Sequence, residues 1–170
     1  GKMIADIPLD ALVSCIENAL FLVLNRYEFE LLSETTNYSA AKILSLARTT
    51  VITDGKAGAK IYKQTSPVDT GDSGGMQSGK AGEHFPPPLA EIPAIPNVGA
   101  ADPYGAGDAF LAGFTAAVAR GSGAAEAGRA GAVAASFAVE AKGAQNHTFS
   151  EEEFIGRYEK YFDRPKADFF

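Results

Sequence analysis

The chain has 170 residues, of which 46% are hydrophobic and 21% are charged, and its formal net charge is −6. This length and composition are those of one globular domain with a sizeable core. The acidic balance and the lack of a Lys/Arg cluster argue against nucleic acid as a partner. No apolar run approaches the ~20 residues that cross a bilayer, and the N-terminus lacks a signal-peptide pattern, so we expect no membrane association.

The single cysteine, Cys15, leaves no possibility of an internal disulfide. We therefore expect a reducing compartment, the cytoplasm or an organelle matrix. Because Cys15 lies within an apolar helical pattern, we interpret it as a buried small hydrophobic residue.

The first half of the chain alternates predicted helices and strands. Apolar spacing predicts a helix over 9–19, and the continuous apolar run 19–25 predicts a strand that is buried on both faces. Two more helices are expected over 27–34 and 37–48, the second with Ser39 as a plausible N-cap. The β-branched run 49–55 predicts a strand, and a second strand follows a short turn, over 58–63.

The second half begins with an irregular stretch, residues 64–90, which we interpret as a long surface loop. A short strand is expected around 92–95. Helices are then predicted over 109–120 and 124–143, the latter rich in small residues that suit tight packing. Ser150 opens the last helix, with Glu153 completing a capping box. Strands that alternate with helices indicate an α/β fold with a mainly parallel sheet.

The sequence GAGD, residues 105–108, stands where the turn meets the predicted helix. Small residues let successive backbone N–H groups point at one spot, and a helix N-terminus adds partial positive charge there. The local pattern alone favours a plain helix start with Asp108 as its N-cap. The functional alternative is a general base beside an anion hole for a phosphoryl group.

Four segments resemble the ribokinase/pfkB carbohydrate kinase family, in the family's order. DPYGAGDAFLAGF is similar to its D-[TP]-T-G-A-G-D-x-F signature, NRYE (25–28) to its N-x-x-E motif and TDGKAG (53–58) to its T-x-G-x-x-G turn. Residues 127–154 resemble the C-terminal helix and tail of proteins in the adenosine-kinase-like branch of this family. The resemblance implies a three-layer α/β/α fold and transfer of the ATP γ-phosphoryl group to a hydroxymethyl group of a nucleoside or sugar.

The resemblance also implies roles for individual residues. Asp108 would be the catalytic base, and Gly105, Ala106 and Gly107 would form the anion hole. Those expected beside the nucleotide are Thr53, Gly55 and Gly58. Asn25 and Glu28 would help to position Mg²⁺ through water, and Asp102, with Gly143 and Ala144 nearby, would belong to a site for a monovalent cation, K⁺. His147 is interpreted as a surface or helix-capping residue, with a place near the adenine as the alternative.

Two departures from the family pattern shape the expectations. Tyr104 stands where the family has a small Thr, and the chain is about half as long as family members. We therefore expect residues 1–170 to be the C-terminal part of such a kinase domain, without the N-terminal lid and substrate-binding part. A missing half or a partner chain would then cover the sheet edge. The alternative function is a kinase-derived, non-catalytic structural or regulatory subunit of a larger assembly.

Overall fold

The computed structural model describes residues 6–64, 85–96 and 102–162. They divide into two compact units, which are described one at a time. The first takes residues 6–52, 60–64 and 85–89, and the second takes 53–59, 90–96 and 102–162. Among the described residues, no helix is long and apolar enough to cross a membrane.

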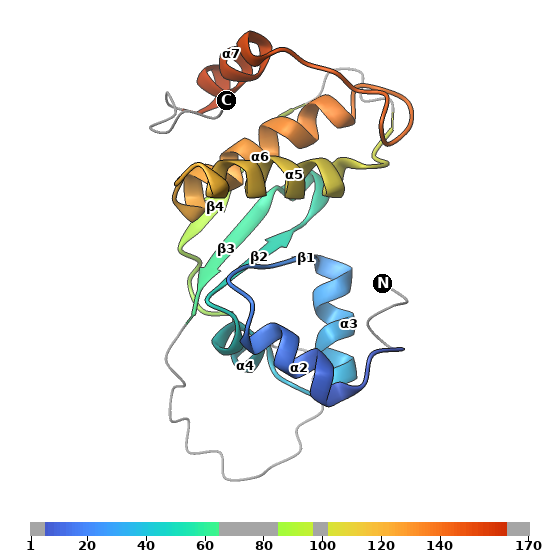
Figure 1. Ribbon diagram of the computed structural model, residues 1–170, viewed down its shortest axis with the longest axis vertical. Coiled ribbons are helices and arrows are strands. Elements are labelled where there is room, and N and C mark those ends of the chain that lie inside the picture. The colour runs from blue at the N-terminus through green and yellow to red at the C-terminus, as the bar shows by residue number, and fades with distance from the viewer. Residues whose placement is uncertain (1–5, 65–84, 97–101, 163–170) are drawn as a thin grey trace. The chain divides into compact units, whose positions relative to one another are not determined.

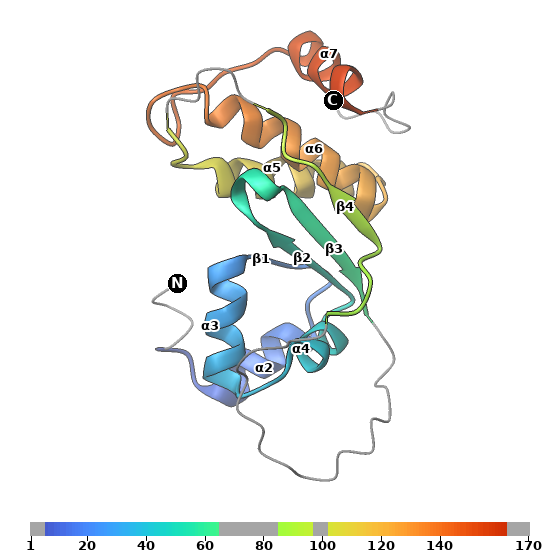
Figure 2. The ribbon, with the colours of Figure 1, turned by 180° about the vertical axis from the view of Figure 1, so that it is seen from behind.

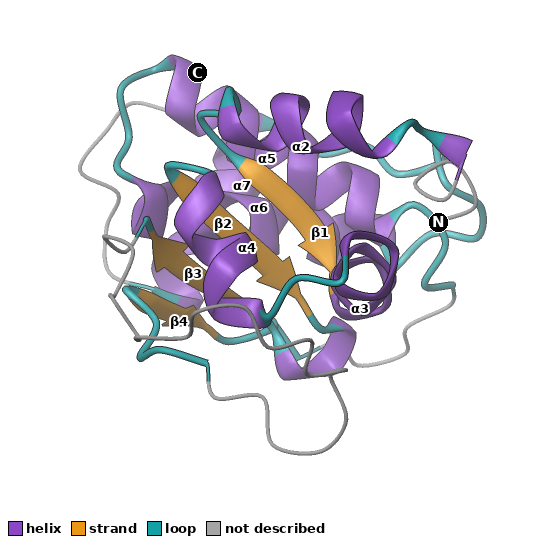
Figure 3. Ribbon diagram, turned by 90° about the horizontal axis from the view of Figure 1, so that it is seen from below, coloured by secondary structure: helices purple, strands orange, loops and turns teal. Residues whose placement is uncertain are grey.

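One four-stranded sheet has the order β1-β2-β3-β4 (Figure 3). Its strands are β1 (Leu22–Asn25), β2 (Thr49–Thr53), β3 (Ala59–Lys63) and β4 (Ala90–Ile92). Backbone hydrogen bonds from Asp54 N to Gly58 O (2.7 Å) and from Gln64 N to Arg48 O (2.9 Å) frame β2 and β3 as an antiparallel hairpin. The neighbouring strands β1 and β2 run in the same direction (Figure 3), so the sheet is mixed, and the fold is the expected partial α/β fold.

The first unit packs three helices around its own apolar core: α2 (Leu9–Glu17), α3 (Arg26–Thr36) and α4 (Ala40–Leu46). Ser39 caps α4 as predicted, because its Oγ accepts a hydrogen bond from Lys42 N at 3.3 Å. The core residues come from these helices and from the neighbouring strands, and include Leu12, Ile16, Phe29, Leu32, Ile43, Leu44, Ile52 and Tyr62.

Two expectations for this unit are wrong. Cys15 is exposed, because α2 turns Leu12 and Ile16, one turn apart, toward the core and leaves the cysteine outside that stripe. Residues Leu22 to Leu24 of β1 are half-buried instead of buried on both faces. Within the described sheet β1 is an outer strand, so it has a neighbouring strand on one side only.

The second unit is built around α5 (Ala106–Ala119) and α6 (Ala124–Ala138), which lie side by side in Figures 1 and 2. Their close approach depends on glycine. A Cβ added to Gly113 would lie 2.8 Å from Ala130 O, and one added to Gly131 would lie 2.8 Å from Phe110 O. The predicted tight packing of the small-residue helix is therefore confirmed, with α5 as its neighbour.

The remaining elements of this unit follow the sequence with shifts at their ends. The predicted strand near 92–95 lies instead at Ala90–Ile92, because Pro93 directly after it has no N–H to donate to a sheet. Helix α6 ends at Ala138, earlier than expected. Helix α7 (Glu151–Tyr161) begins with the predicted capping box between Ser150 and Glu153. Two aromatic side chains one turn apart on α7, Phe154 and Tyr158, are both buried.

Candidate functional site

The first turn of α5 is built on glycine. Gly105 is the N-cap and has φ 81°, in the left-handed region that favours glycine. A Cβ at Gly105 would also lie 2.7 Å from Ala144 Cα, so a side chain has no room there. No side chain caps this end of α5. The GAGD turn therefore presents a helix N-terminus whose first N–H groups are not satisfied by a cap.

The backbone donors of this turn are not equivalent. Ala106 N already donates to Pro103 O at 3.3 Å, whereas no described residue accepts a hydrogen bond from the N–H of Gly107 or Asp108. A Cβ built at Gly107 meets no atom within 4 Å. The space at the Cβ position of Gly107 is thus open, and two N–H groups at this helix N-terminus have no acceptor among the described residues, as in helix N-termini that bind phosphate. Of the three residues expected in the anion hole, Ala106 has the least available N–H.

Asp108 is the third residue of α5, and its side chain is exposed. The interpretation of Asp108 as an N-cap is wrong, because Gly105 occupies that position. At the third position a carboxylate is favoured by the helix dipole. It also stays accessible to a ligand on the same end of the helix.

Asp102 ties this turn to the segment that follows α6. Its Oδ1 accepts a hydrogen bond from Tyr104 N at 3.0 Å, and its Oδ2 accepts one from Gly143 N at 3.0 Å. The Tyr104 side chain is 75% exposed. Asp102, Gly143 and Ala144, grouped from the sequence as a cation region, are thus brought together, and both oxygens of the carboxylate hold backbone amides.

The T-x-G-x-x-G residues form the turn of the β2–β3 hairpin, and they belong to the same unit as the GAGD turn. Thr53 ends β2, and residues Gly55–Ala57 form a short 3-10 helix. Gly58 has φ 91°, and a Cβ there would overlap Ile92 O. Gly58 is therefore required by the close passage of the chain after β4. Lys56 beside it is exposed.

The N-x-x-E residues form a capping box at the start of α3. Glu28 N donates to Asn25 Oδ1 at 2.8 Å, and Asn25 N donates to Glu28 Oε2 at 2.9 Å. The same spacing predicts the capping box at Ser150, and Asn is also a favoured N-cap, but the box at Asn25 is not among the predictions made from the sequence. Asn25 and Glu28 belong to the first unit and Asp108 to the second.

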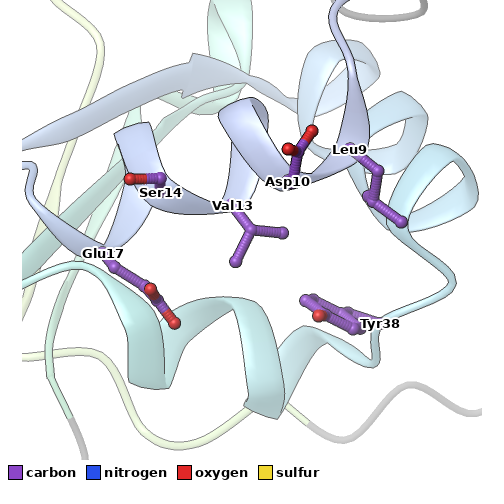
Figure 4. Close-up of a pocket in the computed structure, with 6 residues that line it drawn as sticks. All are labelled: Leu9, Asp10, Val13, Ser14, Glu17 and Tyr38. Carbon is purple, nitrogen blue, oxygen red and sulfur yellow. The ribbon is translucent and has the colours of Figure 1, made fainter.

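The described residues form no metal cluster, and the hollow shown in Figure 4 is lined by none of the predicted site residues. Among residues 6–64, 85–96 and 102–162, no group of three His, Cys, Asp or Glu side chains is placed to hold a metal ion. A hollow of about 510 Å³ lies in the first unit between α2 and Tyr38 (Figure 4). It contains none of the predicted site residues, its lining being Leu9, Asp10, Val13, Ser14, Glu17 and Tyr38.

His147 differs from expectation. It is half-buried, and its Nδ1 is buried without a hydrogen-bond partner among the described residues. Its ring stacks on Phe149 at a centroid distance of 6.4 Å. It is therefore not fully exposed, and Ser150, not His147, caps α7.

Comparison with known proteins gives consistent matches over most of the chain. A sequence profile of the pfkB family carbohydrate kinases matches residues 2–151. A nucleoside kinase of Methanocaldococcus jannaschii is 30% identical over 161 residues, which are 95% of this chain and 46% of that protein. The chain thus spans about half the length of the curated relative it matches.

Solved structures agree with the sequence matches. The crystal structure of the M. jannaschii nucleoside kinase, an archaeal member of the ribokinase family, is 31% identical and aligns with a TM-score of 0.74 over 94% of this chain and 46% of that one. A Burkholderia thailandensis nucleoside kinase in complex with inosine is 27% identical, with a TM-score of 0.79 over 98% and 48% of the two chains. The same kinase in complex with ADP-inosine gives a TM-score of 0.80 at 27% identity, over 99% and 46%.

Proposed function

We propose that the protein transfers the γ-phosphoryl group of ATP to a hydroxymethyl group of a nucleoside, because the chain belongs to the pfkB family of carbohydrate kinases. The observation that carries this proposal is the start of α5, where an uncapped helix N-terminus, open space beside Gly107 and the exposed Asp108 occur together. A nucleoside is preferred to a sugar because relatives at 27–31% identity are nucleoside kinases, one of them solved with inosine.

Asp108 would act as the general base. The substrate hydroxyl oxygen attacks the γ-phosphorus, its proton passes to the Asp108 carboxylate, and the bond between the γ-phosphorus and the ADP oxygen breaks. The N–H groups of Gly107 and Asp108, together with the α5 dipole, would stabilise the charge on the phosphoryl oxygens. Phosphoryl transfer depends mainly on positioning and charge stabilisation, so one base and a few donors suffice.

The other predicted residues would position the nucleotide and its metal. Thr53, Gly55 and Gly58 would border the nucleotide, in a turn where the nearby Ile92 O leaves room only for glycine at Gly58. Mg²⁺ supplies positive charge between the phosphates when it is bound. Asn25 and Glu28 carry the oxygen ligands that this ion prefers, and since they bind each other in the capping box, a contact through water suits them.

The experiment compares two carboxylates at the same helical position. Asp108 is the third residue of α5, and Glu126 is the third residue of α6, whose N-terminus also lacks a side-chain cap. Asp108→Asn should lower kcat by about 10²–10⁴-fold, which is the usual contribution of a general base. Glu126→Gln changes the charge at an equivalent helix end and should leave kcat within about twofold. Equal turnover in both variants would refute Asp108 as the base.

A further inference from the structure

The GAGD turn is held by a segment that is distant from it in sequence. Residues 140–149, called here the α6–α7 segment, run between those two helices. Gly143 N in this segment donates to Asp102 Oδ2 at 3.0 Å, and Ala144 occupies the space in which a Cβ of Gly105 would lie. Any shift of the α6–α7 segment must therefore move the turn that ends in Asp108, or break its contacts.

Arg157 of α7 holds the start of the α6–α7 segment. Its Nη1 donates to Glu140 Oε1 at 2.8 Å and its Nη2 to Glu140 Oε2 at 3.0 Å, so the pair is bidentate. Nη1 also donates to Ser136 Oγ at 3.0 Å. A bidentate guanidinium–carboxylate pair fixes orientation as well as distance.

The same guanidinium also acts on the end of the segment. Arg157 Cζ lies 3.5 Å from the centroid of the Phe137 ring. Phe137 in turn stacks on Phe149 with centroids 4.6 Å apart, and Phe149 stacks on His147. Arg157 thus contacts the start of the α6–α7 segment through Glu140, and it contacts the end through Phe137, which stacks on Phe149. Between these two ends, Gly143 donates a hydrogen bond to Asp102.

We propose that Arg157 is a positioning residue for the phosphate site: through Glu140 and the stack of Phe137 on Phe149, it fixes the α6–α7 segment and thereby the Asp102–Gly143 hydrogen bond that orients the GAGD turn. The inference rests on the proposed function for its link to ATP. Its structural part, the coupling of Arg157 to the Gly143 amide, stands independently of that function.

The chain contains a matched control for this test. Arg129 of α6 places its Cζ 5.9 Å from the centroid of the Phe162 ring, just after the end of α7, so it also makes an arginine–aromatic contact between these helices. That contact involves no residue of the α6–α7 segment. Arg157→Met and Arg129→Met each remove a guanidinium and keep an unbranched apolar side chain. Only Arg157→Met removes the guanidinium that pairs with Glu140 of the α6–α7 segment.

Hydrogen exchange at the Gly143 and Tyr104 amides, which both donate to Asp102, is measured by NMR in the two variants. Arg157→Met should speed exchange at both amides by about fivefold to tenfold relative to Arg129→Met, as expected for loss of one ion pair and one cation–π contact. Arg157→Lys keeps the charge without the planar fork and should give an intermediate result. Equal exchange in Arg157→Met and Arg129→Met overturns the inference.

A second measurement links the coupling to the site. The dissociation constant of ATP–Mg²⁺ should rise about threefold to tenfold in Arg157→Met and stay within twofold in Arg129→Met. If the parent protein does not bind ATP–Mg²⁺, the proposed function fails while the exchange data still decide the role of Arg157. If Arg157→Met does not fold, Glu140→Gln replaces it. That variant weakens the same anchor with little change of shape and must speed exchange at Gly143 for the inference to stand.

Discussion

Substitution of Gly107 by alanine separates the structural role of the α5 N-terminus from its proposed chemical role. Gly107 is the second residue of α5, and it is exposed. A Cβ built there meets no atom within 4 Å, so alanine fits without displacing anything. Alanine in a helix is favoured over glycine by about 0.5–1 kcal/mol. For a chain of this length, that gain raises Tm by about 1–4 °C.

The same methyl group would stand in the space that we assign to a phosphoryl oxygen. Alanine keeps the backbone N–H at this position, so the variant would act by steric exclusion of that oxygen from the donors and not by removing a donor. If ATP–Mg²⁺ binds about 100-fold more weakly, a ligand concentration that stabilises the parent by about 2.7 kcal/mol leaves only about 0.4 kcal/mol in the variant. The Tm of the free protein should therefore rise, and the increase in Tm caused by ATP–Mg²⁺ should nearly disappear.

The assay is a thermal melt with and without ATP–Mg²⁺, and Gly156→Ala provides the control. Gly156 is an exposed glycine inside α7, and a Cβ there also meets no atom within 4 Å. Gly156→Ala should raise the Tm of the free protein and keep the full ligand-induced increase. If Gly107→Ala keeps that increase as well, the space beside Gly107 is not the phosphate site.

Three further predictions concern packing, pH and cations. Gly131→Ala should destabilise the fold by about 1–3 kcal/mol in chemical denaturation, because its methyl group would lie 2.8 Å from Phe110 O; unchanged stability would contradict the close packing of α5 on α6. Hydrogen bonds from Ser150, first its backbone N–H and then its side chain, lower the pKa of Glu153 from its ordinary value of 4.5. The stabilisation of the fold by these hydrogen bonds is present above pH 4.5 and is lost as pH falls through the lowered pKa of Glu153. Glu153→Gln should therefore weaken the acid dependence of Tm, and an unaltered dependence of Tm on pH would contradict this stabilisation. Replacing K⁺ by tetramethylammonium should lower the ATP–Mg²⁺ affinity if a monovalent cation binds near Asp102, and equal affinity in both salts would remove that role.

The sequence predicted the local features of the fold well, because they depend on neighbouring residues. Both Ser39 and Ser150 cap the helices that they were expected to cap. The hairpin turn from Thr53 to Gly58 was also expected as a turn between two strands. Cys15 shows the limit of this reasoning, because its helix is apolar on more than one side and only the packing decides which positions are buried.

The candidate site was harder to predict, since its contacts join distant parts of the chain. The hydrogen bond from Gly143 to Asp102 spans 41 positions, and no spacing rule predicts it. The stacking of Phe149 on Phe137 joins the α6–α7 segment to the last turn of α6 and likewise follows from no spacing rule. The capping box at Asn25, by contrast, is local, since the N-x-x-E spacing places a favoured N-cap three residues before a Glu that can close the box.

The most direct test of the proposed function is phosphoryl transfer from ATP–Mg²⁺ to inosine. It is measured with γ-labelled ATP and the natural full-length protein. A nucleoside kinase with Asp108 as its base should phosphorylate inosine, should give no product with 5′-deoxyinosine, which lacks the acceptor hydroxyl, and should lose about 10²–10⁴-fold in rate in Asp108→Asn. Labelled product formed at the parent rate by Asp108→Asn, or no transfer to any nucleoside that carries a hydroxymethyl group, would contradict the account.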